Sequence, residues 1–536
     1  MHYLRMIICS AIAIIVIVSA GNYLYGPALI DQERAPILRE NIKCEGCNIL
    51  FISIDTLRAD HLGLYGYSRD TSPVLDELGR KSMVFTRFYA PIPETIPSHA
   101  SMFTSRLPHE HKLQFNGQIF PESELTLAEI LGDKGYSTAA FTSVFHMSEI
   151  SGLHQGFKVF DNPEGSFDDL DNELTPREIR KIKYYHHKQM RSEITARVTA
   201  ILDSSEDPGL GPKVSREQWH LLRKRERKKL RPVKFSSVDE AVRVRTVRNL
   251  ERTADKTTDL ALDWLSENKE RPFFMFVHYF DPHEPYLPPS GHDLFADDDH
   301  DLVQAKIAGY DGEIRFVDSE VGRLLDFIGK GGLAEDTVIV VTSDHGESLG
   351  EHNYFWDHGD LLYEDQLRIP LIIYSKGMSF RDDRLSQNIQ LMPTILGIIG
   401  NGSGHTTVPS LFSGDTLGTL IFESDRCKEP TVNNNRCYPH LQLSGKMIAS
   451  RNQGFKYILT PRKNDKVHEE LYDLRADPLE SSNTIGRERH NDTRDELRAA
   501  VDGVKDSVHS RVTQDRIAVA VNPDVLNGLK SLGYIV

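Results

Sequence analysis

The stretch that decides the fold is Asn48-Ile-Leu-Phe-Ile-Ser-Ile-Asp55, a nearly continuous apolar run that ends in a carboxylate. A parallel strand buried on both faces has this pattern. The same design recurs at residues 272–279 and 337–344, and helical patterns occur at 126–134 and 310–328. We therefore predict an α/β fold with a doubly wound, mostly parallel sheet flanked by helices. Ligand-binding groups are then expected at the carboxyl ends of the strands.

The composition is that of a globular protein, with 536 residues, 39% hydrophobic residues and a net charge of −15. Such a charge argues against a nucleic-acid binder, because phosphate binding needs a surplus of Lys and Arg. We predict a catalytic α/β domain at 45–425 and a smaller C-terminal α+β subdomain with a helical tail at 442–536. A strongly basic helical insertion is expected at about 169–236. It is either a solvated insertion, a cap that attracts an anionic substrate, or a patch facing anionic lipid headgroups.

Residues 1–25 have the pattern of a secretory signal: a short basic start, an apolar run and a small-residue end. If the run extends through residue 25, a retained membrane anchor is equally consistent with the pattern. Both alternatives predict an exported protein, either periplasmic, extracellular or anchored in a membrane and facing outside the cytoplasm.

Four cysteines lie outside this segment, and an even number in an exported chain predicts disulfides. Of the three connectivities, the simplest pairs Cys44 with Cys47 and Cys427 with Cys437. The competing interpretation of Cys44-Glu-Gly-Cys47 is a redox or zinc motif. It lacks a second ligand pair at a suitable spacing.

The chemistry is predicted from three separated segments. Asp55 and Asp344 each end an apolar strand, and His345 follows at once. Two carboxylates and an imidazole at strand ends suit a divalent cation, with Zn²⁺ or Mn²⁺ favoured and Ca²⁺ or Mg²⁺ as alternatives. Thr95 precedes a helix-like run, where a helix N-terminus favours an anion. Its hydroxyl is a weak nucleophile that metal coordination can activate.

These segments resemble the sulfatase family of the alkaline phosphatase superfamily, over residues 48–483. The resemblance rests on the first metal-ligand strand around Asp55, the Asp344-His-Gly-Glu segment, the C-terminal Leu471-Tyr-Asp-Leu signature, and Thr95-x-Pro-Ser98 in place of the family's nucleophile motif. It implies a metal-dependent ester hydrolase or transferase. One cation is expected to be held by Asp55, Asp344, His345 and the Thr95 oxygen.

Two departures from the nucleophile motif affect the predicted chemistry. The family's enzymes oxidise Cys or Ser to formylglycine, but the methyl group on Cβ of Thr95 prevents formation of an aldehyde. His99 stands where the family has Arg. Thr as a direct nucleophile resembles the phosphodiesterases and phospho-headgroup transferases of the superfamily. We therefore favour hydrolysis of phosphate mono- or diesters. The alternatives are a sulfuric ester hydrolase without formylglycine and a membrane-associated phospho-headgroup transferase.

Further roles follow from the same resemblance. His283 and His358 are expected to bind the ester or protonate the leaving alcohol. Ser98 and His99 are also expected to bind substrate. A second metal held by Asp281, His283 and His358 is an alternative, although Asp281-Pro-His283 is shorter than the superfamily's usual Asp-x-x-x-His. The substrate is expected to be an anionic ester, either a small molecule or a group on a glycan or lipid.

Overall fold

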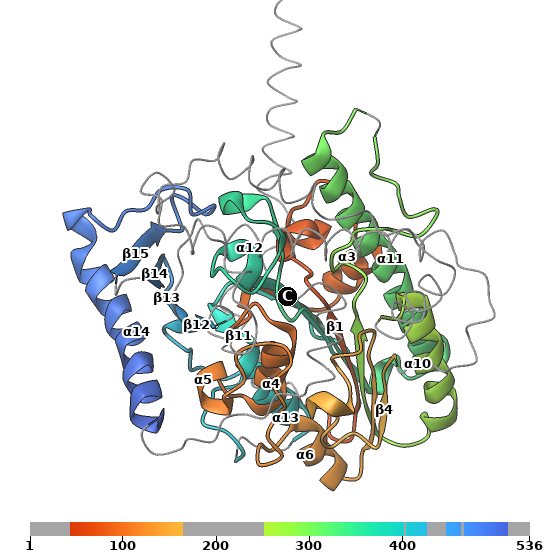
Figure 1. Ribbon diagram of the computed structural model, residues 1–536. Coiled ribbons are helices and arrows are strands. Elements are labelled where there is room, and N and C mark those ends of the chain that lie inside the picture. Colours follow the sequence, from red (N-terminus) through yellow and green to blue (C-terminus); the bar gives the residue numbers. More distant parts are fainter. Residues whose placement is uncertain are drawn as a thin grey trace, which may run out of the picture.

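The computed structural model describes residues 43–163, 251–297, 299–400, 404–425, 446–462 and 466–512. The predicted signal or anchor at 1–25, the basic insertion at 169–236 and the predicted Cys427–Cys437 pair lie outside these residues. Helices cover both faces of a central sheet, and a second, smaller sheet lies at one side of the molecule (Figure 1).

The central sheet is mixed and mostly parallel, as predicted. Within the described residues it has nine strands in the order β10-β2-β9-β6-β1-β5-β3-β4, with β11 also paired to β2. The exception is β9, which runs antiparallel to both β2 and β6. The strands are β1 (Asn48–Ile54), β2 (Met83–Tyr89), β3 (Ser137–Phe141), β4 (Val159–Asp161), β5 (Phe273–Tyr279), β6 (Thr337–Thr342), β9 (Arg368–Tyr374), β10 (Phe380–Asp382) and β11 (Ser386–Gln387).

The three predicted apolar strands lie side by side at the centre of this sheet. β1 pairs in parallel with β5 on one side and β6 on the other, so that Ser53 lies beside both His278 and Thr342. Because the three strands run in the same direction in this register, their carboxyl ends meet at one edge. The segments that follow them are thereby brought together.

Alternate residues of β1 enter two different cores. Ile49 and Phe51 pack in a cluster with α4 (Thr95–Thr104), α6 (Leu127–Asp133) and α13 (Leu391–Ile398). Leu50 and Ile52 pack on the other face with α3 (Pro73–Arg80), α10 (Ala254–Asn268) and α11 (Leu302–Lys330). This two-sided burial explains why the strand is apolar throughout instead of alternating.

Local signals at helix starts account for the helix bounds. Thr126 caps α6 and forms a capping box with Glu129, which places the helix start where the sequence predicts it. The other predicted helix, at 310–328, is the later part of α11. That helix begins earlier because Asp301 and Gln304 form another capping box. Its first turns are largely exposed and lack the apolar periodicity that marks the remainder.

The second sheet is antiparallel, with β12 (Leu420–Ser424), β13 (Met447–Arg451), β14 (Phe455–Arg462) and β15 (Lys466–Asp473) in sequential order. Helix α14 (Asn491–Val512) packs on it through Leu497 and Val501. The edge strand β12 comes from a segment upstream of the predicted start at 442. The domain boundaries themselves remain predictions.

The remaining elements are short. They are α5 (Pro108–His111), α12 (Glu364–Leu367), β7 (Ser348–Leu349), β8 (Phe355–Asp357), and the 3-10 turns Ala59–His61, Gly63–Tyr65, Glu149–Ser151, Ala334–Asp336, Glu351–Asn353, Asn388–Gln390 and Glu488–His490. Cys44 and Cys47 form a disulfide just before β1. Among the described helices, none has both the length and the apolar character needed to cross a bilayer.

We expect Phe276→Ala to lower the free energy of unfolding by about 3–5 kcal/mol, the usual cost of a large cavity in a core. The Phe276 ring is 1% exposed and packs edge-on against Phe51 of β1 and Phe103 of α4, so its loss leaves a cavity between these side chains. Leu294→Ala is the control, because Leu294 is 60% exposed and its loss should cost less than about 0.5 kcal/mol. Denaturant unfolding of both variants tests this, and equal losses would contradict it.

Candidate active site

Asp55, Asp344 and His345 converge at the shared edge of the central strands. Asp55 follows β1, and the other two residues follow β6. All three side chains are fully buried, and one ligand atom from each lies within 4.8 Å of the others. The structure therefore brings three of the four predicted ligands into one group, although Asp55 lies almost 300 positions before Asp344 and His345 in the sequence.

The carboxylates in this group lack the hydrogen bonds that buried oxygens normally have. Among the described residues, neither oxygen of Asp55 accepts a hydrogen bond, and neither does Oδ2 of Asp344. Oδ1 of Asp344 accepts from the main-chain N–H groups of Thr56 and His345 at 3.2 and 2.8 Å. Burial, followed by the neighbouring charge of Asp344, raises the pKa of Asp55 well above its usual value. Buried carboxyl oxygens of this kind require a compensating positive charge, so the donor set fits a divalent cation.

A main-chain hydrogen bond orients His345 toward this group. Its Nδ1 lies 2.8 Å from the carbonyl oxygen of Gly346, which can only accept, so Nδ1 carries the proton. Nε2 therefore presents its lone pair, 3.5 Å from Oδ2 of Asp344. A hydrogen bond on the far nitrogen is the usual way in which a protein fixes a metal-binding imidazole.

Thr95 lies beside the same nitrogen. It is the first residue of α4 and only 1% exposed, and its Oγ1 is 3.5 Å from Nε2 of His345. The N-terminus of a ten-residue helix offers main-chain N–H groups and a partial positive charge to an anion. The structure thus places a hydroxyl, an anion-binding helix end and the buried carboxylates next to one another.

Ser98 and His99 attach α4 to the sheet. The Ser98 hydroxyl donates to the carbonyl oxygen of Asp344 at 2.6 Å and accepts from Asn388 at 2.9 Å. Nδ1 of His99 donates to the carbonyl oxygen of Thr95 at 2.8 Å, and Nε2 accepts from the Ser53 hydroxyl at 2.9 Å. Burial lowers the pKa of His99, which keeps it neutral. The polar atoms of both side chains are thus used in positioning Thr95. The roles of Ser98 and His99 in binding substrate remain predictions.

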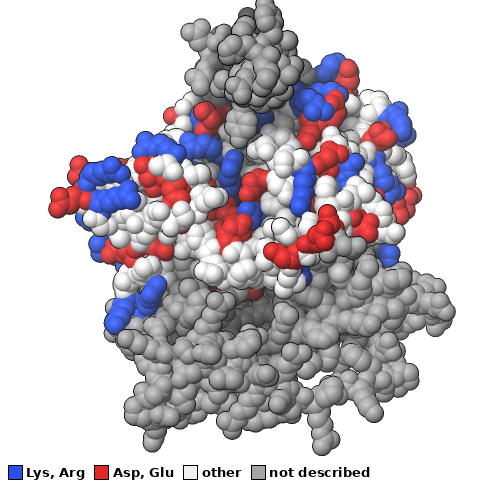
Figure 2. Space-filling view, turned by 90° about the horizontal axis from the view of Figure 1, so that it is seen from above, with Lys and Arg blue, Asp and Glu red and all other residues white. Residues whose placement is uncertain are grey.

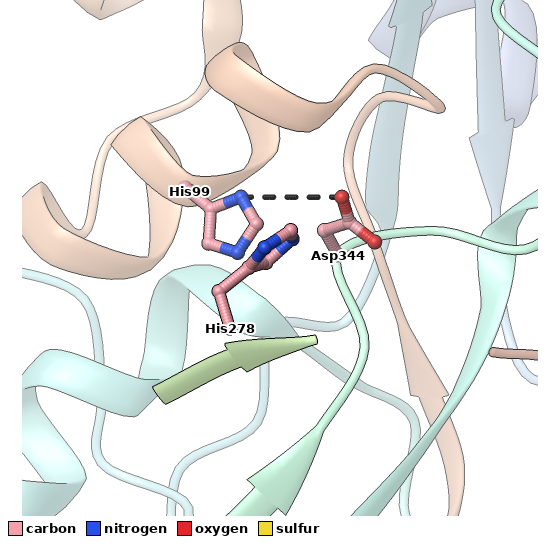
Figure 3. A group of neighbouring side chains, drawn as sticks. All are labelled: His99, His278 and Asp344. Carbon is pink, nitrogen blue, oxygen red and sulfur yellow. Dashed lines mark ion pairs between the residues drawn. The ribbon is translucent and has the colours of Figure 1, made fainter. Parts of the chain in front are cut away.

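His278 is a site residue that the sequence did not single out. Its buried ring extends from β5 with Nε2 3.3 Å from Oδ2 of Asp55. Burial and then the neighbouring His99 lower its pKa well below the usual value. Figure 3 shows His278 beside His99 and Asp344, with the 3.9 Å contact between Nδ1 of His99 and Oδ2 of Asp344 drawn as a dashed line. Both nitrogens of His99 already form hydrogen bonds. We therefore interpret His99 and His278 as residues that pack next to the two carboxylates and do not bind a cation themselves. The position of His278 near the carboxyl end of the apolar strand β5 is the sequence signal that could have revealed it.

The structure forms a second group of ligand atoms from His283, Glu347 and His358. Asp281, which the sequence suggested as the third member, is buried but belongs to none of the groups that the described residues form. Glu347 takes its place because the turn after Asp344-His345 brings it close to His283 and His358. The short spacing of Asp281-Pro-His283 already differed from the usual ligand pattern.

Close backbone packing fixes that turn. The N–H of Gly346 donates to the carbonyl oxygen of Gln366 at 2.8 Å, and a Cβ at Gly346 would lie 2.1 Å from the carbonyl oxygen of Asp365. Only glycine allows this approach. The Arg58 guanidinium donates to the carbonyl oxygen of Glu347 at 3.1 Å and pairs with Glu351 at 2.8 Å. The turn that carries His345 and Glu347 is therefore held from two sides.

The fold and the site together define an α/β metallohydrolase. The sulfatase family model matches residues 47–401, and the model for the C-terminal region of N-sulphoglucosamine sulphohydrolase matches 350–507. The chain belongs to the sulfatase family, within the alkaline phosphatase superfamily, and is an ester hydrolase of that superfamily.

Individual relatives agree with this assignment. The chain is 23% identical over 503 residues to an arylsulfatase of Clostridium perfringens, covering 84% of this chain and 92% of the relative. It is 25% identical over 478 residues to human arylsulfatase A, covering 82% and 83%. Among solved structures, the phosphonate monoester hydrolase of Agrobacterium radiobacter superimposes with a TM-score of 0.59 at 19% identity. That match covers 86% of this chain and 96% of the other.

We expect chelation to lower the thermal unfolding midpoint, because removal of a cation leaves Asp55 and Asp344 uncompensated. Zn²⁺ or Mn²⁺ at a thousandfold excess over its Kd should restore about 4 kcal/mol. Asp55→Asn should give a smaller rise, whereas the matched variant Asp281→Asn should respond like the native protein. Differential scanning calorimetry measures all three. A native midpoint that is identical with and without chelator would contradict a cation site here.

Proposed function

We propose that this sulfatase-family enzyme hydrolyses phosphate mono- or diesters with Thr95 as its nucleophile. The observation that carries the proposal is the position of the Thr95 hydroxyl, 3.5 Å from Nε2 of His345 at the N-terminus of α4. This position suits a nucleophile, because the carboxylates of Asp55 and Asp344 lie close to the His345 imidazole and could hold a cation beside the hydroxyl.

The chemistry of threonine favours phosphorus over sulfur. The methyl group on Cβ prevents conversion of Thr95 to an aldehyde, so the side chain can attack only as an alcohol. The structural likeness to a phosphonate monoester hydrolase is compatible with phosphorus chemistry on this fold.

The reaction would proceed by two displacements at one centre. A divalent cation held by Asp55, Asp344 and His345 would lower the pKa of the Thr95 hydroxyl and offset the charge on the ester. Oγ1 of Thr95 forms a bond to phosphorus as the bond from phosphorus to the alcohol oxygen breaks, and the hydroxyl proton ends on the departing alcohol. Water then releases the phosphoryl group and restores Thr95.

The second candidate is hydrolysis of sulfate esters by the same hydroxyl. It is favoured by the match of residues 350–507 to the C-terminal region of a sulphohydrolase family and by the sulfatases among the relatives. A transferase would differ only in the acceptor, because an alcohol on a glycan or lipid would replace water. On the face shown in Figure 2, acidic and basic side chains are interspersed over the described residues.

An aryl phosphodiester and an aryl sulfate distinguish the two ester types. We expect release of the aryl alcohol from the phosphodiester and a phosphoryl adduct on Thr95, detected by intact-mass and peptide mass spectrometry after rapid acid quenching. Thr95→Val should lower turnover by at least about 1,000-fold, as removal of a covalent nucleophile does. The control is Thr104→Val at the far end of α4, whose hydroxyl bonds to the carbonyl oxygen of Ala100. Turnover of the sulfate alone, with an unmodified Thr95, would reverse the proposed ester type.

We also propose that the protein is exported. The Cys44–Cys47 disulfide supports this, because such bonds persist in oxidising compartments. Fractionation of cells and sequencing of the mature N-terminus test the proposal. A start near residue 21 would indicate a cleaved signal, and a retained residue 1 in the membrane fraction would indicate an anchor. Recovery in the cytoplasm would contradict export.

A further inference from the structure

His283 and His358 face each other beside His345 of the Thr95 site. Their Nε2 atoms are 3.1 Å apart, and the side chains are 3% and 1% exposed. Nδ1 of His283 lies 2.8 Å from the carbonyl oxygen of Glu284, and Nδ1 of His358 lies 2.9 Å from that of Pro93. A carbonyl oxygen only accepts, so each Nδ1 must donate its hydrogen.

This arrangement fixes both neutral imidazoles in the tautomer with a bare Nε2. Two nitrogen lone pairs then point at each other across 3.1 Å in a buried site, and they repel unless a positive charge lies between them. Two imidazoles on a tetrahedral zinc ion, with Zn–N bonds of about 2.0–2.1 Å, hold their nitrogens about 3.3 Å apart. The observed distance between the two Nε2 atoms is therefore close to that expected for two histidines bound to one cation. The same tautomer disfavours the predicted role of His283 and His358 as proton donors, because Nε2 carries no proton in it.

Glu347 supplies the third ligand atom, which lies within 4.8 Å of the two histidine nitrogens. The Tyr286 hydroxyl donates to its Oε2 at 2.5 Å, which fixes the plane of the carboxylate. Such a contact orients a ligand in the way that outer hydrogen bonds do at known metal sites.

The β7–β8 hairpin joins Glu347 to His358 and sets their spacing. It contains positive φ angles at the non-glycine residues His352, Asn353 and Trp356, of 54°, 58° and 55°. Each such residue costs free energy and persists where the surrounding structure requires it. The hairpin therefore has a defined strained shape that returns His358 to Glu347.

We propose that His283, Glu347 and His358 form a second cation site, selective for zinc or a similar borderline ion. Two nitrogens and one carboxylate oxygen are the ligands that such ions prefer, and a fourth position would remain for substrate or water. The rings of His345 and His358 are 4.2 Å apart between centroids, so the second site adjoins the first. The inference deepens the proposed function and rests on it for its catalytic meaning: a cation here would offset charge on the leaving oxygen.

Metal content tests the site without reference to activity. The full-length purified protein is stripped with a chelator, dialysed against Zn²⁺ and analysed for bound metal by inductively coupled plasma mass spectrometry, with affinities from titration calorimetry. We expect two equivalents in the native protein. His283→Gln, Glu347→Gln and His358→Gln should each retain one equivalent and weaken the other by at least about 100-fold, more than loss of an outer contact costs.

The matched control is His352→Gln, which changes a histidine in the same hairpin that stacks on Tyr363 and belongs to none of the ligand groups. It should retain two equivalents. Asp55→Asn should lose the first equivalent and keep the second. Circular dichroism and the retained equivalent of metal show that each variant is folded. Because three ligands are substituted separately, the test still holds if one of the variants fails to fold.

One equivalent in the native protein, unchanged by the three ligand substitutions, would overturn the proposal and leave a shared proton as the positive charge between the two rings. Two equivalents that survive all three substitutions would also overturn it. Neither result depends on ester turnover. The second site can therefore fail while the Thr95 adduct is observed, or stand while the adduct is absent.

Discussion

The site depends on the repulsion between buried carboxylates. Asp55 and Asp344 lie at the ends of adjacent parallel strands, fully buried and with three of their four oxygens accepting no hydrogen bond from the residues that the structure describes. Folding brings these charges together at a considerable cost that their own side-chain contacts do not offset. A cation held by Asp55, Asp344 and His345 would offset this cost and would couple the stability of the central sheet to the chemistry of the site.

The Thr95 hydroxyl is positioned by hydrogen bonds that tie α4 to the central sheet. Ser98 connects α4 to the main chain of Asp344, and His99 connects the same helix to Ser53 on β1. Both strand and helix are packed around Phe51 and Phe276, so the core sets the distance between Thr95 and His345. This explains why a polar, histidine-bearing helix face is fully buried: its polar groups are bonded to the sheet.

A sequence motif identifies residue types, whereas side-chain roles depend on hydrogen-bond partners. His99 occupies the position of an anion-binding arginine in the resemblance, yet its two nitrogens are bonded to Thr95 and Ser53. His283 and His358 are predicted to bind the ester or to protonate its alcohol, and contacts of their Nδ1 atoms with the carbonyl oxygens of Glu284 and Pro93 decide which ring nitrogen carries the proton. Such partners lie far away in the sequence or on the main chain, where no side-chain pattern records them.

The sequence by itself determined the mostly parallel sheet, the three central strands and the residues at their carboxyl ends. It did so because burial on both faces forces an apolar run, and parallel strands end at one edge. Only the tertiary structure decided that Glu347 rather than Asp281 joins His283 and His358, and that His278 supports Asp55. The path of the turn after His345 and the register of β5 on β1 set those contacts, and both result from packing between segments distant in the chain.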